Sequence, residues 1–91
     1  MKTIRQLVME NLRRNGLETP LLQRRLIDAW PSVAGDDAAH HTTSLAIRHQ
    51  TLYVSMTASA LRFELFMRRS LLVERLNQSV GATIITDIRF C

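Results

Sequence analysis

Residues 45–57 read LAIRHQTLYVSMT, and this stretch decides the fold because its hydrophobic residues recur at every second position. Alternation of apolar and polar side chains is typical of a β-strand with one buried face. The alternation is interrupted at His49-Gln50, which predicts a short turn and therefore a β-hairpin. The positions predicted to face the core are Leu45, Ile47, Leu52, Val54 and Met56.

Downstream of the hairpin, the pattern changes to helical spacing from Ser59 to Ser79. A single helix would mix arginines into its leucine stripe and leave large apolar residues on the opposite side. A break near Ser70 removes this conflict, so we predict a kink or two helices. One face is then formed by Phe63, Phe66 and Met67, and another by Leu72, Val73, Leu76 and Val80. Gly81 closes the segment, and residues 84–90 alternate again, which predicts a last strand.

Two helices are predicted before the hairpin. Residues 3–15 place apolar side chains at helical spacing and end before Gly16, a residue type typical of helix C-termini. A Thr-Pro pair opens a second helix over residues 19–30, and Pro31 is expected to end or kink it. Residues 35–40 are predicted to form a turn or a short helix that leads into the hairpin.

The predicted element order is α-α-(turn)-β-β-α-(α)-β. A hairpin followed by a helical crossover and a third strand gives a three-stranded mixed sheet, with helices on one face. The fold class is therefore α+β, and the order resembles the type II arrangement of KH domains with an extra N-terminal helix. We expect a single domain over residues 1–91, with residues 1–21 as its N-terminal helical part.

Composition narrows the function classes. The chain has 91 residues, of which 46% are hydrophobic, and a net charge of +4. Lys2 is the only lysine among the 12 basic residues, so the other eleven are arginines. No apolar run approaches the ~20 residues that span a bilayer. The single cysteine, Cys91, excludes an internal disulfide. We therefore expect a cytoplasmic protein of bacterial type that does not act at a membrane.

No pattern points to catalysis. Phosphate-binding, dinucleotide-binding, nucleophile-elbow and zinc-protease motifs are absent from the sequence. Adjacent histidines such as His40-His41 point in different directions, so they are more typical of one packed and one solvated side chain than of a metal site. We predict no enzymatic activity, no cofactor and no metal.

The arginines point to a polyanion, since a guanidinium binds phosphate through two hydrogen bonds. The alternative is a solvated helix face partly paired with acidic neighbours. Arg68-Arg69 lies at the predicted helix break, where KH domains carry a glycine loop that contacts the nucleic-acid backbone. The candidate nucleic-acid-binding residues are Arg13, Arg14, Arg24, Arg25, Arg62, Arg68 and Arg69.

Trp30 is the candidate partner-binding residue. Its spacing with Leu26 and Ile27 is typical of the core or its rim. The alternative is an exposed anchor for another protein, since tryptophan is enriched at interface hot spots.

Several short motifs occur in an order that resembles one bacterial family, the DciA-type domain, long catalogued as a domain of unknown function. The similarity covers about residues 22–91. The segments are Ala29-Trp30-Pro31-Ser32-Val33-Ala34-Gly35, His41-Thr42, Leu52-Tyr53-Val54, Ser59-Ala60-Leu61-Arg62-Phe63-Glu64-Leu65 and Asp87-Ile88-Arg89-Phe90.

This resemblance implies a KH-like fold and a role in loading or operating the replicative helicase DnaB, with affinity for DNA. The family tryptophan, here Trp30, would contact the helicase or support the structure. We therefore expect a non-enzymatic adaptor whose partners are a DnaB-type helicase and single- or double-stranded DNA, with RNA less favoured. The alternative is a protein-interaction module, such as a homodimer, with little affinity for nucleic acid.

Overall fold

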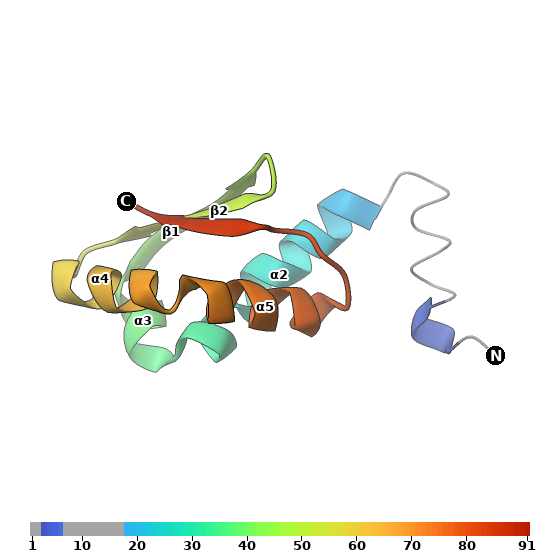
Figure 1. Cartoon of the computed structure of the whole chain (residues 1–91), viewed down its shortest axis with the longest axis horizontal. Helices are drawn as coiled ribbons and strands as arrows, with labels where there is room; N and C mark the ends of the chain where they lie inside the picture. The colour runs from blue at the N-terminus through green and yellow to red at the C-terminus, as the bar shows by residue number, and fades with distance from the viewer. Residues whose placement is uncertain (1–2, 7–17) are drawn as a thin grey trace.

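The computed structural model describes residues 3–6 and 18–91 (Figure 1). Ile4 to Gln6 are helical. The remainder of the helix predicted over residues 3–15, including Arg13 and Arg14, lies outside the described residues. The elements that follow are α2 (Glu18–Ala34), α3 (Asp36–His41), β1 (Thr42–Arg48), β2 (Thr51–Met56), α4 (Ser59–Met67), α5 (Arg69–Val80) and β3 (Asp87–Phe90).

The three strands form one mixed sheet in the order β1-β2-β3. β1 and β2 are antiparallel, with Ala46 opposite Tyr53, and β2 and β3 are parallel, with Tyr53 beside Arg89. Helices α4 and α5 make the crossover that brings β3 back beside β2 (Figure 1). The α+β class and the mixed sheet are therefore confirmed, whereas the KH-like arrangement stays a prediction.

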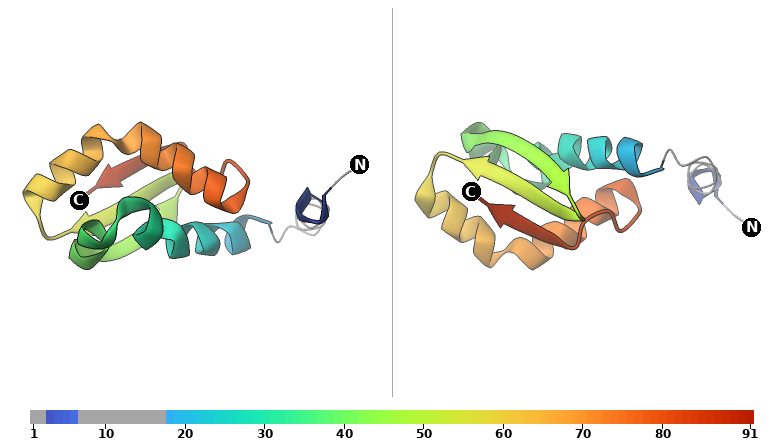
Figure 2. Two further views of the ribbon diagram at one scale, coloured as in Figure 1. Left: turned by 90° about the horizontal axis from the view of Figure 1, so that it is seen from below. Right: turned by 90° about the horizontal axis from the view of Figure 1, so that it is seen from above.

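The helices cover one face of the sheet and leave the other face open (Figure 2). Helix α2 lies along α5 in the opposite direction, so that its first turns lie beside the last turns of α5 (Figures 1 and 2). Helix α4 lies at the other end of the molecule, as does the short helix α3 on the opposite side of that end (Figures 1 and 2). This layering places the core between the sheet and the α2–α5 pair.

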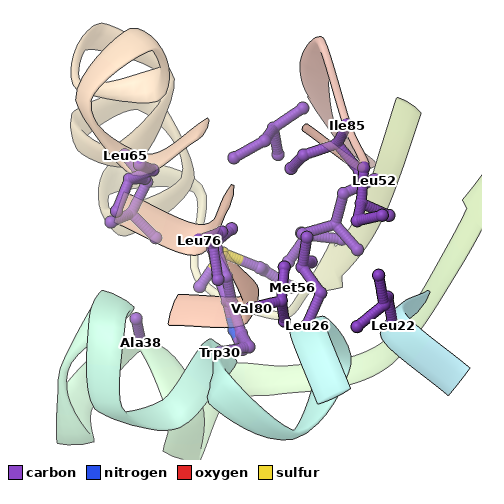
Figure 3. Packing of buried hydrophobic residues seen from close by; sticks show 14 residues of the cluster. Leu22, Leu26, Trp30, Ala38, Leu52, Met56, Leu65, Leu76, Val80 and Ile85 are labelled. Atoms are coloured by element: carbon purple, nitrogen blue, oxygen red, sulfur yellow. The ribbon is translucent and has the colours of Figure 1, made fainter. Parts of the chain in front are cut away.

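The core is continuous from the helices to the sheet (Figure 3). Leu22, Leu26 and Trp30 from α2 are at most 1% exposed and pack toward Leu76 of α5 and Leu52 of β2. These positions of α2 recur every four residues, which is the spacing of one helical face. The period of two in the hairpin is also confirmed, because Leu52, Val54 and Met56 are buried.

Two predicted boundaries differ from the structure. Pro31 does not end α2, which runs to Ala34, because a proline in the last turn removes one hydrogen-bond donor while its own carbonyl still accepts from the Gly35 amide at 3.1 Å. The helix also begins at Glu18, so that the Thr-Pro pair falls inside its first turn.

The last strand is shorter than predicted. It begins at Asp87 rather than at residue 84, and Ile84 and Ile85 are both buried instead of alternating. The side chain of Asn77 causes this: its Oδ1 accepts from the amides of Ile84 at 3.0 Å and Ile85 at 3.1 Å. Its Nδ2 donates to the carbonyl of Ile85 at 2.8 Å. These bonds hold Ile84 and Ile85 against α5, so that the strand begins only at Asp87.

The predicted helix break is confirmed, two residues earlier than expected. Arg68 separates α4 from α5 with φ −102° and ψ 10°, outside the helical range. Gly81 ends α5 with φ 75°, a left-handed conformation that glycine adopts without steric cost.

Candidate functional site

The break between α4 and α5 creates a corner where large apolar side chains reach solvent. Phe63 is 67% exposed, Met67 70%, Phe66 47% and Leu71 45%. A monomeric domain seldom leaves so many large apolar residues exposed close together in sequence without a partner. We call Phe63, Phe66, Met67 and Leu71, together with Arg62, Arg68 and Arg69, the corner surface.

The local sequence dictates this exposure. In α4 the buried side chain is Leu65, with Leu61 half-buried one turn earlier, so this stripe faces the core. Phe63, Phe66 and Met67 follow the i, i+3, i+4 spacing of a second face, which points away. The break then turns the chain so that Leu72 and Leu76 of α5 enter the core. Two apolar faces on one segment therefore leave one face exposed.

Arg69 is fixed by three contacts. Its guanidinium lies over the ring of Phe66, 4.2 Å from the centroid, and it donates to the carbonyl of the same residue at 3.4 Å. Its Nε also lies 3.7 Å from the carboxylate of Asp87 in β3. A guanidinium on an aromatic face leaves the outer face of the cation open to a second planar group or an anion.

Arg68 pairs with Glu64 at 3.6 Å, and both side chains are more than half exposed. Exposed pairs of this type contribute little to stability and exchange partners readily. Arg62 is half-buried and lies one helical turn before Phe66, on the same side of α4. Arg62 and Arg69 therefore lie on the side of Phe66, whereas Arg68 lines a second hollow with Phe63 and Met67.

The predicted arginines of α2 lie elsewhere on the surface. Arg24 and Arg25 are exposed on α2, and Arg24 pairs with Asp28 at 3.4 Å. The first half of α2 lies beside the end of α5, away from α4 (Figure 2). Arg13 and Arg14 lie outside the described residues. The described members of the predicted set are therefore divided between α2 and the α4–α5 segment.

Arg89 joins the site from a strand and is not among the site residues that the sequence predicted. A shallow hollow of about 310 Å³ lies between α4–α5 and β3, lined by Phe66 and Arg69 on one side and by Asp87 and Arg89 on the other. The alternation of residues 87–90 already placed Arg89 on the outward side of its strand. Which helix lies beside Arg89 depends on the order of the strands in the sheet. The alternation within a single strand does not give that order.

Trp30 is 1% exposed and belongs to the core. Its indole nitrogen donates to Thr42 Oγ1 at 3.0 Å, and its ring lies 6.4 Å from that of Phe90, centroid to centroid. Of the two positions predicted for Trp30, a core residue or an exposed anchor, the structure has the core residue. An exposed-anchor role would require the indole to leave its place between α2 and the sheet.

The histidine pair behaves as expected for one packed and one solvated side chain. His41 is half-buried with Nδ1 2.9 Å from the carbonyl oxygen of Asp37, and His40 is exposed. No group of three His, Cys, Asp or Glu residues in the described ranges is arranged to hold a metal ion. Within the same ranges, no helix has the length and apolar character needed to cross a membrane.

Apolar and basic side chains at an exposed helix break are features typical of a binding surface on a small α+β protein. The chain belongs to the DciA family: the family model described as "Dna[CI] antecedent, DciA" matches residues 3–90. Membership implies involvement in loading the replicative helicase DnaB, in a family of loaders and adaptors rather than of known catalysts. No curated protein and no solved structure matches the chain.

Proposed function

We propose that this protein is a nucleic-acid-associated adaptor that assists the loading of a DnaB-type replicative helicase in the bacterial cytoplasm. The family supports the helicase as partner. The corner surface supports the adaptor role, because it combines side chains suited to a protein interface with side chains suited to phosphate.

The observation on which this proposal rests is the grouping of arginines around an exposed aromatic ring. Arg69 stacks on Phe66, and Arg62 lies one turn before that ring on α4. Arginine with an exposed aromatic ring is the combination by which many proteins bind single strands, since the cation contacts phosphate and the ring stacks on a base. Arg62, Arg68 and Arg69 are therefore our proposed nucleic-acid contacts. Arg24 and Arg25 could add only a separate, weaker contact.

The protein-interaction alternative is favoured by a different part of the same corner. Phe63, Met67 and Leu71 carry exposed apolar surface that a helicase segment would cover. A homodimer through this surface is less favourable, because it would bring Arg68 and Arg69 of both copies together. We therefore assign these three residues to the helicase contact rather than to self-association.

The test combines two measurements on the purified full chain. Co-sedimentation with the cognate DnaB-type helicase, and loading of that helicase onto single-stranded DNA, measure the adaptor role. Fluorescence anisotropy with a labelled single strand between 50 and 200 mM salt measures the nucleic-acid contact, because counterion release makes such binding salt-dependent.

We expect helicase binding at micromolar protein, faster loading, and affinity for DNA that falls with salt. The double variant Arg68→Gln/Arg69→Gln should weaken DNA binding, whereas Arg24→Gln/Arg25→Gln, with the same charge change, should have a smaller effect. Absence of both helicase binding and a loading effect would contradict the adaptor function. Equal effects of the two arginine variants would contradict the corner as the site of nucleic-acid contact.

A further inference from the structure

Within residues 3–6 and 18–91, no segment covers the face of the sheet opposite the helices, and this face takes no part in the core (Figure 2). Its outward positions alternate with the buried ones, as expected for a sheet with one solvated face. Tyr53 lies at its centre, half-buried, with Ala46 opposite on β1 and Arg89 beside it on β3. This ring is the sole aromatic side chain at an outward position of the described strands.

Small neighbours leave room over that ring. A hollow of about 350 Å³ is lined by Tyr53, Arg48, Ala46, Ser44 and Ser55. Alanine and serine are too short to cover the neighbouring phenol ring. An incoming planar group could therefore lie against Tyr53 and reach the two hydroxyl groups for hydrogen bonds.

The charge on this face is positive. Arg48 and Arg89 are both exposed at its borders, on β1 and β3. Asp87 is the one acidic residue in the described strands. Its carboxylate already has two partners, Arg69 Nε at 3.7 Å and the Ile88 amide, which donates to it at 2.9 Å. From the strand register and ordinary sheet spacings, the Cα atoms of Arg48 and Arg89 are roughly 12 Å apart. Two long side chains at that separation can reach successive phosphates.

This face is also continuous with the corner surface. The hollow of about 310 Å³ beside β3 is lined by Phe66 and Arg69 as well as by Arg89. Arg89 therefore stands between the helix break and Tyr53. A flexible polyanion bound at the corner could pass over the edge of β3 and onto the open sheet.

We propose that the open face of the sheet binds single-stranded nucleic acid, with a base stacked on Tyr53 and phosphates on Arg48 and Arg89. This inference rests on the proposed function and extends its contact beyond the helix break. A single strand is the occupant because its bases are free to stack on a side chain, whereas duplex bases stack on each other. The absence of an unpaired carboxylate on the described part of this face fits the same ligand.

The test measures the affinity of fluorescein-labelled oligothymidylates by anisotropy as a function of salt, with the full chain. Tyr53→Leu removes the aromatic ring but keeps an apolar side chain of similar size, and Tyr53→Phe restores the ring. We expect roughly tenfold weaker binding for Tyr53→Leu and near-normal binding for Tyr53→Phe, given the usual contribution of one stacked base. Circular dichroism melting of each variant establishes that it remains folded.

The double variant Arg48→Gln/Arg89→Gln should reduce the slope of log K against log salt by about 1.4, from two phosphate contacts on a single strand. Arg24→Gln/Arg25→Gln is the control with the same charge change away from the sheet.

If the sheet variants bind like the wild type while Arg68→Gln/Arg69→Gln binds more weakly, the inference is overturned and the proposed function stands. If the wild type shows no salt-dependent binding, the nucleic-acid part of the proposed function fails together with the inference. Binding to duplex as tight as to the single strand, unchanged by Tyr53→Leu, would also overturn it.

Discussion

Trp30 is held by a hydrogen bond as well as by packing. Its indole donates to Thr42 Oγ1 at 3.0 Å, and that hydroxyl in turn donates to the carbonyl of Ala38 at 2.6 Å. One threonine thus joins α2, α3 and the start of β1. A buried indole N–H without an acceptor would cost about 1–3 kcal/mol.

We therefore predict that Thr42→Val destabilises the protein by about 1–3 kcal/mol, because valine keeps the shape but cannot accept from the indole. Urea unfolding followed by the fluorescence of Trp30, the only tryptophan, measures the change. Thr43→Val is the matched control: Thr43 is exposed, and its hydroxyl bonds only the Ser55 carbonyl at 3.1 Å. Equal losses in the two variants would contradict the role of the indole bond.

The sequence indicates the core position of Trp30 through its spacing, but not the hydrogen bond. Leu22, Leu26 and Trp30 repeat every four residues, so burial on one helix face was predictable. Thr42 lies twelve residues later in a strand, and no local pattern pairs it with the indole. Long-range polar partners depend on the packing of elements, which periodicity does not describe.

Among the elements, β3 depends on Asn77 of α5. Its amide side chain accepts from two backbone amides and donates to one carbonyl in the segment between α5 and β3. Asn77→Ala removes all three bonds from partly buried groups, so we predict a loss of about 2–4 kcal/mol. Chemical denaturation measures it, with faster amide exchange at Ile84 and Ile85. Gln78→Ala, on the exposed side of the same helix, should change stability by less than about 0.5 kcal/mol.

The two residues of the hairpin turn adopt a strained backbone conformation. His49 and Gln50 have φ of 49° and 63°, the left-handed region that Asn and Gly tolerate better. Replacing them with Asn-Gly should therefore stabilise the protein by about 1 kcal/mol. A higher urea midpoint with an unchanged slope measures this gain. His49→Val should act in the opposite direction, because a β-branched residue is poorest at positive φ, and a stabilising effect of valine would refute the explanation.

The elements themselves were largely predictable, for identifiable reasons. The break at Arg68 followed from two incompatible apolar faces within one helical segment. The end of α2 did not follow, since Pro31 removes one donor but its own carbonyl still accepts from the Gly35 amide, so that the helix continues to Ala34. The start of β3 was missed because residues 84–90 read as one alternating strand, whereas Asn77 holds both Ile84 and Ile85 against the core.

In the molecule as a whole, the functional surfaces depend on how the elements meet. Arg68 and Arg69 could be placed together from sequence, because both lie at the predicted break. Arg48, Tyr53 and Arg89 share a face only once β3 is known to lie parallel to β2. A single sequence reveals which side of its own strand each residue occupies, but not which strands are neighbours.

The uncharged and the charged side chains of the corner surface predict that helicase binding and nucleic-acid binding can be separated. Phe63 and Met67 are uncharged and 67% and 70% exposed, so serine at both positions should leave the fold and the arginines unchanged. Covering two such side chains at an interface is worth more than about 1.4 kcal/mol, or tenfold in affinity. Phe63→Ser/Met67→Ser should therefore bind the DnaB-type helicase at least tenfold more weakly, and single-stranded DNA within about twofold of the wild type.

The matched control for that variant is Leu21→Ser, which removes another exposed apolar side chain, 39% exposed, from α2 at the other end of the molecule. Sedimentation with the helicase and anisotropy with a labelled single strand, at one salt concentration, give both affinities for each variant. Leu21→Ser should change neither. Weaker helicase binding by Leu21→Ser to the same extent would show that the contact is not confined to the corner. Parallel loss of both affinities in Phe63→Ser/Met67→Ser would show that helicase and DNA contact the same side chains, because independent contacts respond separately to the loss of uncharged side chains.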